Sequence, residues 1–209
     1  TYEAMRNAVQ QLPGVVSVAG TRNHIGFGYR SVTVEAEGQK REIDYFEVGD
    51  NYLQIMDLNT LAGRPFDLSR EADYDRAVLI SQKMAAEFGW SAEAAIGKQI
   101  RLDTATFNVV GTLRNFHQQH LFEPIEPAMM RLTRPERYVN LIIRAQPAEL
   151  KSVYDRVKAQ WAQLNPLKPF HGFYQDEVGA EAYKVTSSIA TIFSWFAIVA
   201  MLLTATGLF

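Results

Sequence analysis

Two histidines three residues apart, His117 and His120, carry the side chains in this sequence that are best suited to binding a metal ion. Glu123 and Glu126 follow closely, and imidazole nitrogens with carboxylates are common ligands of zinc and other transition metals. However, no third ligand is in view, and the neighbouring glutamines and Pro124 are typical of a surface loop. We therefore expect no metal site here.

The sequence holds no other set of residues that predicts catalysis. It contains no cysteine, which excludes disulfides, thiolate zinc sites and cysteine nucleophiles, and which suits an extracytoplasmic domain. Phosphate-binding loops, zinc signatures and nucleophile elbows are also missing. Gly26-Phe27-Gly28 is a G-x-G sequence without the third glycine and following helix of a dinucleotide site, so we interpret it as a flexible turn. We expect no catalytic residues and no cofactor.

The distribution of charge is more informative than its total. The 21 basic and 23 acidic residues leave a net charge of −2, so the chain has no overall basic field that would hold nucleic acid. All of these charges lie in residues 1–184, and the last 25 residues carry none. This asymmetry predicts two parts, an extracytoplasmic domain over residues 1–184 and a transmembrane helix over residues 185–209.

The apolar core of the predicted transmembrane helix extends from residue 189 to residue 209. Of these 21 residues, 16 are apolar and the others are serine, threonine or glycine. A helix of that length is about 31 Å long, close to the hydrocarbon thickness of a bilayer. The alternative is a buried core helix, although soluble helices usually carry a polar stripe. Residues characteristic of the predicted span are Ile189, Phe193, Trp195, Phe196, Leu202 and Gly207.

The residues that flank this segment predict its orientation. The residues just before the span include three acidic side chains and one basic side chain, namely Asp176, Glu177, Glu181 and Lys184. Basic residues are therefore not in excess there. By the positive-inside rule, the large charged part is expected outside the cytoplasm. Because the sequence begins at Thr1 and ends in the apolar run, we expect a fragment of a longer membrane protein.

Hydrophobic periodicity in the charged part predicts interleaved helices and strands. Helical spacing and caps predict helices over residues 2–12, 51–58, 82–88, 92–96 and 150–164, and a further helix from about residue 177. Alternation predicts strands over residues 15–19, 29–36, 41–48, 77–80, 100–102, 107–113, 138–144 and 170–174. We predict an α+β or α/β fold with a mixed sheet, in one lobe or in two that join at the charge-rich segment 65–75.

Four short motifs in a fixed order carry a family resemblance. They are Gly63-Arg64-Pro65-Phe66, Val78-Leu79-Ile80-Ser81, Ile96-Gly97-Lys98-Gln99-Ile100 and the run from Val109 through Gly111 to Phe116-His117. Together they resemble the extracytoplasmic core domain of permeases of the MacB and FtsX type. The segment 121–127, which includes Glu123 and Pro124, is similar to that of lone permeases without a fused ATPase. Residues 192–197 and 206–209 resemble the start of the FtsX-like membrane domain.

The resemblance implies a subunit of an ABC transporter in the bacterial inner membrane, with residues 1–184 on the periplasmic side. It implies a separate cytoplasmic ABC ATPase subunit, a permease dimer, and either a periplasmic adaptor or a substrate as a further partner. In MacB-like members the periplasmic domain moves when the ATPases close, which is called mechanotransmission. Domains of this family often have an acidic residue at the position before Phe116, where this chain has Asn115. The resemblance therefore implies no carboxylate function at this position.

Two other classes of protein remain open at this point. An extracytoplasmic sensor domain, joined by a membrane helix to a cytoplasmic kinase, would show the same asymmetry of charge. A membrane-anchored enzyme would need a clustered acid, base or metal set, which the sequence does not assemble.

Overall fold

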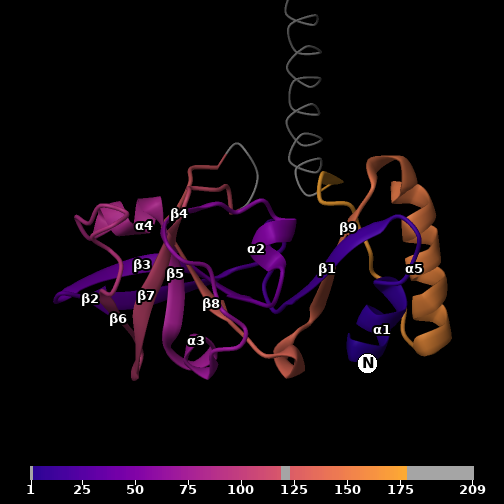
Figure 1. The fold of residues 1–209 in the computed structure, drawn as a ribbon, viewed down its shortest axis with the longest axis horizontal. Helices are drawn as coiled ribbons and strands as arrows, with labels where there is room; N and C mark the ends of the chain where they lie inside the picture. The colour runs from indigo at the N-terminus through magenta and orange to yellow at the C-terminus, as the bar shows by residue number, and fades with distance from the viewer. Residues whose placement is uncertain (1, 119–122, 178–209) are drawn as a thin grey trace, which may run out of the picture.

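The computed structural model describes residues 2–118 and 123–177 of the chain (Figure 1). The strands are β1 (Val15–Thr21), β2 (Arg30–Ala36), β3 (Gln39–Val48), β4 (Thr60–Gly63), β5 (Ala77–Ser81), β6 (Gln99–Leu102), β7 (Ala105–Leu113), β8 (Ala128–Leu132) and β9 (Asn140–Ala145). The helices are α1 (Tyr2–Val9), α2 (Tyr52–Ile55), α3 (Glu71–Arg76), α4 (Gln82–Glu87) and α5 (Leu150–Leu164), with short 3-10 helices η1 (Pro135–Arg137) and η2 (Pro147–Glu149). The predicted mixed sheet and α+β class are confirmed.

Six of the strands close into a ring, which forms the large lobe on the left of Figure 1. The pairing order is β2, β6, β7, β5, β8 and β3, and β3 pairs back to β2. The pairs β5–β7 and β3–β8 are parallel and the others are antiparallel. Because side chains alternate across a strand, each strand sends every second residue to the inside of the ring.

The two faces of the ring bury different apolar clusters. Val78 and Ile80 of β5 pack inside with Met129, and Phe88 and Trp90 after α4 complete this inner cluster. On the outer face, apolar side chains from β3, β5 and β8 pack beneath α2, and they form a second cluster with Phe46, Leu79, Met130, Tyr52 and Ile55 as members. Both faces of these strands are therefore buried.

The small lobe, on the right of Figure 1, consists of α1, β1, β9 and α5. β1 and β9 pair in an antiparallel manner, and Met5, Val9 and Val18 form a third cluster with Val153 and Val157 of α5. The only strand pair that joins the lobes in the described part of the chain is Thr21 with Val48, between β1 and β3.

Residues 65–75, the expected junction, instead lie within the large lobe. β4 before this segment and β5 after it both pair with β7, so the chain does not leave the ring. The charged residues of the segment form local ion pairs, between Arg64 and Asp73 and between Arg70 and Asp67. The chain crosses between the lobes after β1 and again before β9.

Two further predictions of secondary structure are wrong. Residues 170–174 form no strand, because Phe170 and Tyr174 pack their rings against Tyr154 of α5 instead of joining the sheet. Residues 92–96 form turns rather than a helix. β4, α3 and β8 were not predicted from the sequence, and β4 has only four residues.

No helix in the described ranges is long and apolar enough to cross a bilayer. The predicted transmembrane helix over residues 189–209, and the predicted helix from about residue 177, lie outside the described residues except for Glu177 itself.

Candidate functional site

The motif residues Gly63 and Gly111 bring β4 into close contact with β7. The two glycines are partners in the pairing of these strands, and Gly63 has φ +74°, a left-handed conformation. A Cβ atom on Gly63 would lie 2.3 Å from the carbonyl oxygen of Val110, and one on Gly111 would lie 2.4 Å from that of Arg64. Both positions therefore require glycine, and their role is structural.

Arg64 and Phe66 fix the segment that follows β4. Arg64 donates two hydrogen bonds to the buried carboxylate of Asp73, at 2.6 and 2.8 Å, and the Asp67 amide donates a third at 2.8 Å. The hydrogen bonds from Arg64 lower the pKa of Asp73 below its usual value. Phe66 packs on the outer apolar cluster, and the Gly97 amide bonds to the Val109 carbonyl at 2.8 Å. These motif residues thus stabilise the ring.

The motif that ends in Phe116 and His117 lies after β7. Asn115 accepts a hydrogen bond from the Lys83 amide at 2.7 Å, which satisfies a free donor in the first turn of α4. Phe116 packs edge-on against Phe46, with ring centroids 6.3 Å apart. His117 has a buried Nδ1 atom without a hydrogen-bond partner among the described residues.

The structure does not assemble the histidine pair into a described metal site. His120 lies outside the described residues, and Glu123 and the exposed Pro124 lie beyond it. Among residues 2–118 and 123–177, no group of three potential ligands comes together. The two ends of this loop are joined instead by Gln118, whose amide group bonds to both backbone groups of Glu126, at 2.7 and 3.2 Å.

A partly buried site, which was not predicted from the sequence, joins the last described residues to the large lobe. We call it the coupling site and define it by His24, Phe27, Tyr52, Phe173 and Gln175. Nδ1 of His24 lies 3.0 Å from the Tyr52 hydroxyl, and Nε2 lies 2.6 Å from Oε1 of Gln175. The site therefore brings together residues that are up to 151 positions apart.

The hydrogen bonds of the coupling site determine the protonation state of His24. The Ile25 amide donates to the Tyr52 hydroxyl at 3.1 Å, and the Gln175 amide group donates to the Ile25 carbonyl at 3.2 Å. The Tyr52 hydroxyl is then free to donate to Nδ1, so Nε2 of His24 carries the hydrogen and donates to Gln175. Burial lowers the pKa of His24, although the bond to Gln175 opposes this, and burial raises the pKa of Tyr52. Both side chains are therefore neutral at pH 7.

Aromatic contacts attach the same C-terminal segment to both lobes. Phe173 stacks on Phe27 of the large lobe, with ring centroids 3.6 Å apart and an angle of 26° between the rings. In the other direction, the hydroxyl of Tyr154 on α5 donates to the Gly172 carbonyl at 3.0 Å, and the Tyr154 ring lies 5.2 Å from that of Tyr174. A force applied to residues 172–175 would therefore act on both lobes.

The junction between the lobes contains a buried carboxylate. Glu47 of β3 has a side chain that is 2% exposed, and it forms ion pairs with Arg22 at 3.2 Å and with Arg137 at 2.9 Å. Arg22 follows β1 and Arg137 precedes β9, so each lies on one of the two chain segments that cross between the lobes. Glu47 therefore holds both connections to the same point of β3.

An aromatic ring fills the same junction. The side chain of Tyr138 lies against Gly20 and Gly49. A Cβ atom on Gly20 would lie 2.1 Å from its ring, and one on Gly49 would lie 2.2 Å from its hydroxyl oxygen. Tyr2 of α1 contacts this ring edge-on, with centroids 4.9 Å apart, and the Tyr138 hydroxyl donates to the Thr133 carbonyl at 3.1 Å. The lobes are thus held together by close packing as well as by charge.

Asp44 of β3 lies in an acidic environment at the start of the pairing with β8. Burial raises its pKa from 3.8 to about 6, and repulsion from Glu126, Glu42 and Glu123 adds to this effect. Because the folded state binds a proton that the unfolded state has released between about pH 4 and pH 6, ionisation of Asp44 lowers stability as the pH rises through that window.

We expect the substitution Asp44→Asn to stabilise the domain at pH 7.5, because asparagine cannot ionise. The gain is about 1–2 kcal/mol once screening by solvent is allowed for, and it disappears below about pH 4. Urea unfolding at several pH values measures it. Asp155→Asn, on the exposed face of α5, is the matched control and should give no such gain. A stability difference that is the same at pH 4 and at pH 7.5 would contradict the assignment.

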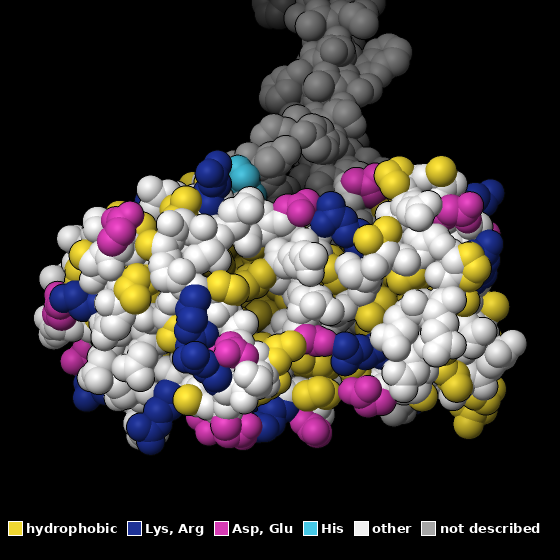
Figure 2. Space-filling view, in the orientation of Figure 1, with side chains coloured by type: hydrophobic (Ala, Val, Ile, Leu, Met, Phe, Trp, Pro, Cys, Tyr) yellow, Lys and Arg dark blue, Asp and Glu magenta, His cyan; other side chains and the backbone are white. Residues whose placement is uncertain are grey.

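Side chains of both signs are interspersed on the face that Figure 2 shows, over both lobes, without a patch of a single sign. This agrees with the balanced composition, which gives no electrostatic reason to expect nucleic acid as a partner.

Comparison with known proteins identifies the fold. The family model described as MacB-like periplasmic core domain matches residues 1–160. The extracellular domain of the noncanonic ABC-type transporter YknZ from Gram-positive bacteria is 19% identical, with a TM-score of 0.60 over 79% of this chain and 84% of that one. The periplasmic region of MacB from Actinobacillus actinomycetemcomitans is 11% identical, with a TM-score of 0.64 over 84% of this chain and 79% of that one.

No curated protein matches the sequence. The family model nevertheless covers most of the chain, including all four motifs and both lobes, and the two solved domains share the fold. The chain therefore belongs to the MacB-like periplasmic core domain family, the extracytoplasmic domain of permeases of the MacB and FtsX type.

Proposed function

We propose that this chain is the part of an ABC permease that transmits movement from the membrane to the periplasm. In this proposal residues 1–184 lie on the periplasmic side of the bacterial inner membrane, and residues 185–209 form a transmembrane helix. A separate cytoplasmic ATPase subunit hydrolyses ATP, two permeases form a dimer, and their periplasmic domains move an adaptor or a substrate. The chain itself performs no catalysis.

The observation that supports this proposal best is the coupling site. Phe173 and Gln175 lie about a dozen residues before the predicted transmembrane helix. Phe173 stacks on Phe27, and Gln175 is hydrogen-bonded to His24 and to the Ile25 carbonyl of the large lobe. The same segment is bound to α5 of the small lobe through Tyr154. A displacement of residues 172–175 would reach both lobes through these hydrogen bonds and stacked rings.

Spin-label distances in the reconstituted transporter test this function. Single cysteines at the exposed positions Ala159 and Gln82 report on the small and large lobes; residues 1–209 contain no other cysteine, and any in the remainder of the transporter are first replaced by serine. In the full permease with its ATPase subunit, we expect the distance between equivalent labels in the two copies to change when ATP replaces ADP. An ATPase subunit that binds but does not hydrolyse ATP is the control, and it should hold the labels at the ATP-bound distance.

Two results would contradict the proposal. Distances that do not depend on the nucleotide would exclude mechanical coupling, and labels accessible only from the cytoplasmic side would exclude the proposed topology. The sensor alternative predicts instead that distances respond to an external ligand in the absence of any ATPase.

A further inference from the structure

β1 has one edge that is almost unpaired. On one side it pairs with β9 along its length, but on the other side it meets β3 only at Thr21 and Val48. Two backbone hydrogen bonds flank this pair, from Gly49 to the Gly20 carbonyl and from Arg22 to the Glu47 carbonyl, both at 2.9 Å. The chain then turns away, because Asn51 adopts a left-handed conformation with φ 58° and α2 begins.

The register of this pair shows which backbone groups remain free. In an antiparallel strand, alternate residues direct their N–H and C=O groups to the same edge. Since Gly20 and Arg22 both bond toward β3, Val18 directs its N–H and C=O to the same side. No described residue forms a hydrogen bond with either group of Val18 on that side. A strand edge of this kind is usually paired, covered or blunted by charge.

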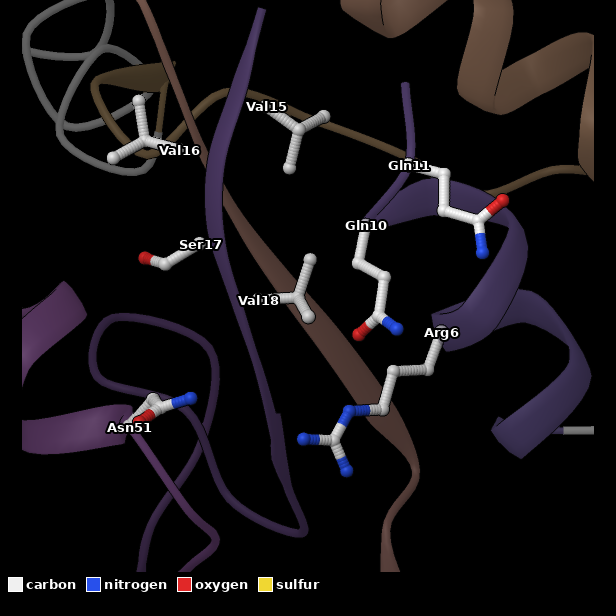
Figure 3. A pocket seen from close by; sticks show the side chains of 8 residues that line it. All are labelled: Arg6, Gln10, Gln11, Val15, Val16, Ser17, Val18 and Asn51. Atoms are coloured by element: carbon white, nitrogen blue, oxygen red, sulfur yellow. The ribbon is translucent and has the colours of Figure 1, made fainter. Parts of the chain in front are cut away.

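A groove of about 430 Å³ lies along this edge (Figure 3). In Figure 3, Arg6, Gln10 and Gln11 of the α1 region line one side, and Asn51 faces β1 from the other. The side chain of Val18 points toward α1, whereas that of Ser17 points toward Asn51. The edge of β1 therefore lies between two walls that carry carboxamide side chains.

The polar groups of the groove suit the backbone of a polypeptide. Carboxamides donate and accept hydrogen bonds without a net charge, as peptide groups do. Arg6 is already paired with Asp50, so the two charges balance. The second carboxylate oxygen of Asp50, Oδ1, is buried and has no partner among the described residues, so it can accept one more hydrogen bond.

We propose that the free edge of β1 binds an extended, uncharged segment of another protein, which adds to the small lobe as a strand. Val18 would exchange main-chain hydrogen bonds with that segment, and its alternating side chains would contact Gln10 on one wall and Asn51 on the other. A second copy of this domain is a poor fit, because its own β1 edge is recessed between the same walls. A single extended segment carries no such walls. This inference does not depend on the transport function.

A tethered probe tests the proposal at high effective concentration. The probe is a six-residue peptide of alternating threonine and valine, fused before Thr1 of the full chain in detergent micelles through a flexible Gly/Ser linker. A linker of twelve residues has a root-mean-square length of about 19 Å, enough to return past α1, which is about 12 Å long. We expect hydrogen exchange at the Val18 amide to slow by about tenfold or more relative to the linker alone.

Two variants distinguish strand addition from other effects. Gln10→Trp fills the groove and should abolish the protection, whereas Asn7→Trp, on the exposed face of α1, should leave it intact. A probe with proline at alternate positions cannot donate main-chain hydrogen bonds and should not protect Val18. Unchanged exchange at Val18, or protection that survives Gln10→Trp and the proline probe, would overturn the proposal. If the Val18 amide is protected only in samples that sediment as a dimer, a second copy of the domain occupies the edge, and this result also overturns the proposal.

Discussion

Replacement of Arg22 and Arg137 together by alanine is expected to destabilise the domain by about 3 kcal/mol or more. The physical reason is that the Glu47 side chain is only 2% exposed, so the double variant leaves a carboxylate in the junction without a positive partner. Each single replacement should cost less, because one arginine remains and both are more than 40% exposed. Equilibrium unfolding in urea at pH 7.5 measures the three free energies.

A rescue variant separates this effect from a simple loss of packing. Adding Glu47→Gln to the double variant removes the unpaired charge and should recover most of the lost stability. Arg76→Ala, at the exposed end of α3, is a control for the loss of a surface arginine and should change stability by less than about 0.5 kcal/mol. A double variant as stable as the wild type, or one that Glu47→Gln does not improve, would show that Glu47 does not hold the lobes together.

The double variant Phe173→Ala with Gln175→Ala is expected to uncouple the domain from the membrane without unfolding it. Neither residue belongs to the three apolar clusters, so both lobes keep their cores. The variant loses the stacking on Phe27 and the hydrogen bond to Nε2 of His24. Under the proposed function, we expect about a tenfold or greater loss of ATP-driven transport, which is the usual size of coupling between two sites.

The measurement compares transport with ATP hydrolysis in the same reconstituted sample. Hydrolysis should persist while transport and the nucleotide-dependent label distances are lost. His171→Ala, exposed and in the same segment but outside the coupling site, is the matched control. Loss of both activities together, accompanied by a lower unfolding midpoint, would indicate that Phe173 and Gln175 stabilise the fold rather than transmit movement.

The elements that were predictable from the sequence are those whose stabilising contacts are local. The hairpin of β2 and β3 joins adjacent alternating segments, and α4 begins where Ser81 accepts a hydrogen bond from the Met84 amide. The amphipathic helix α5, bounded by prolines, was predicted within a few residues. Each of these signals lies within about twenty residues of the chain.

The closure of the ring and the coupling site were not predictable in this way. β8 has buried side chains at four of its five positions, so it shows no alternation, and its parallel partner β3 lies about 85 residues earlier. The aromatic residues of segment 170–174 alternate as in a strand, but their rings pack against Tyr154 of α5 instead. His24 and Gln175 have no sequence signal at all, because neither lies in a motif and only the fold makes them neighbours.

The position of the large lobe between the two halves of the small lobe determines when each part can form during synthesis. Val18 pairs with Ile143, so β1 and α1 leave the ribosome long before the strand and helix that complete their core. At about 5–20 residues per second, this delay is about 6–25 seconds. The ring of the large lobe can close during that interval, whereas β1 still lacks its partner strand β9. We therefore expect chaperones that bind the nascent chain to bind the segment that contains α1 and β1.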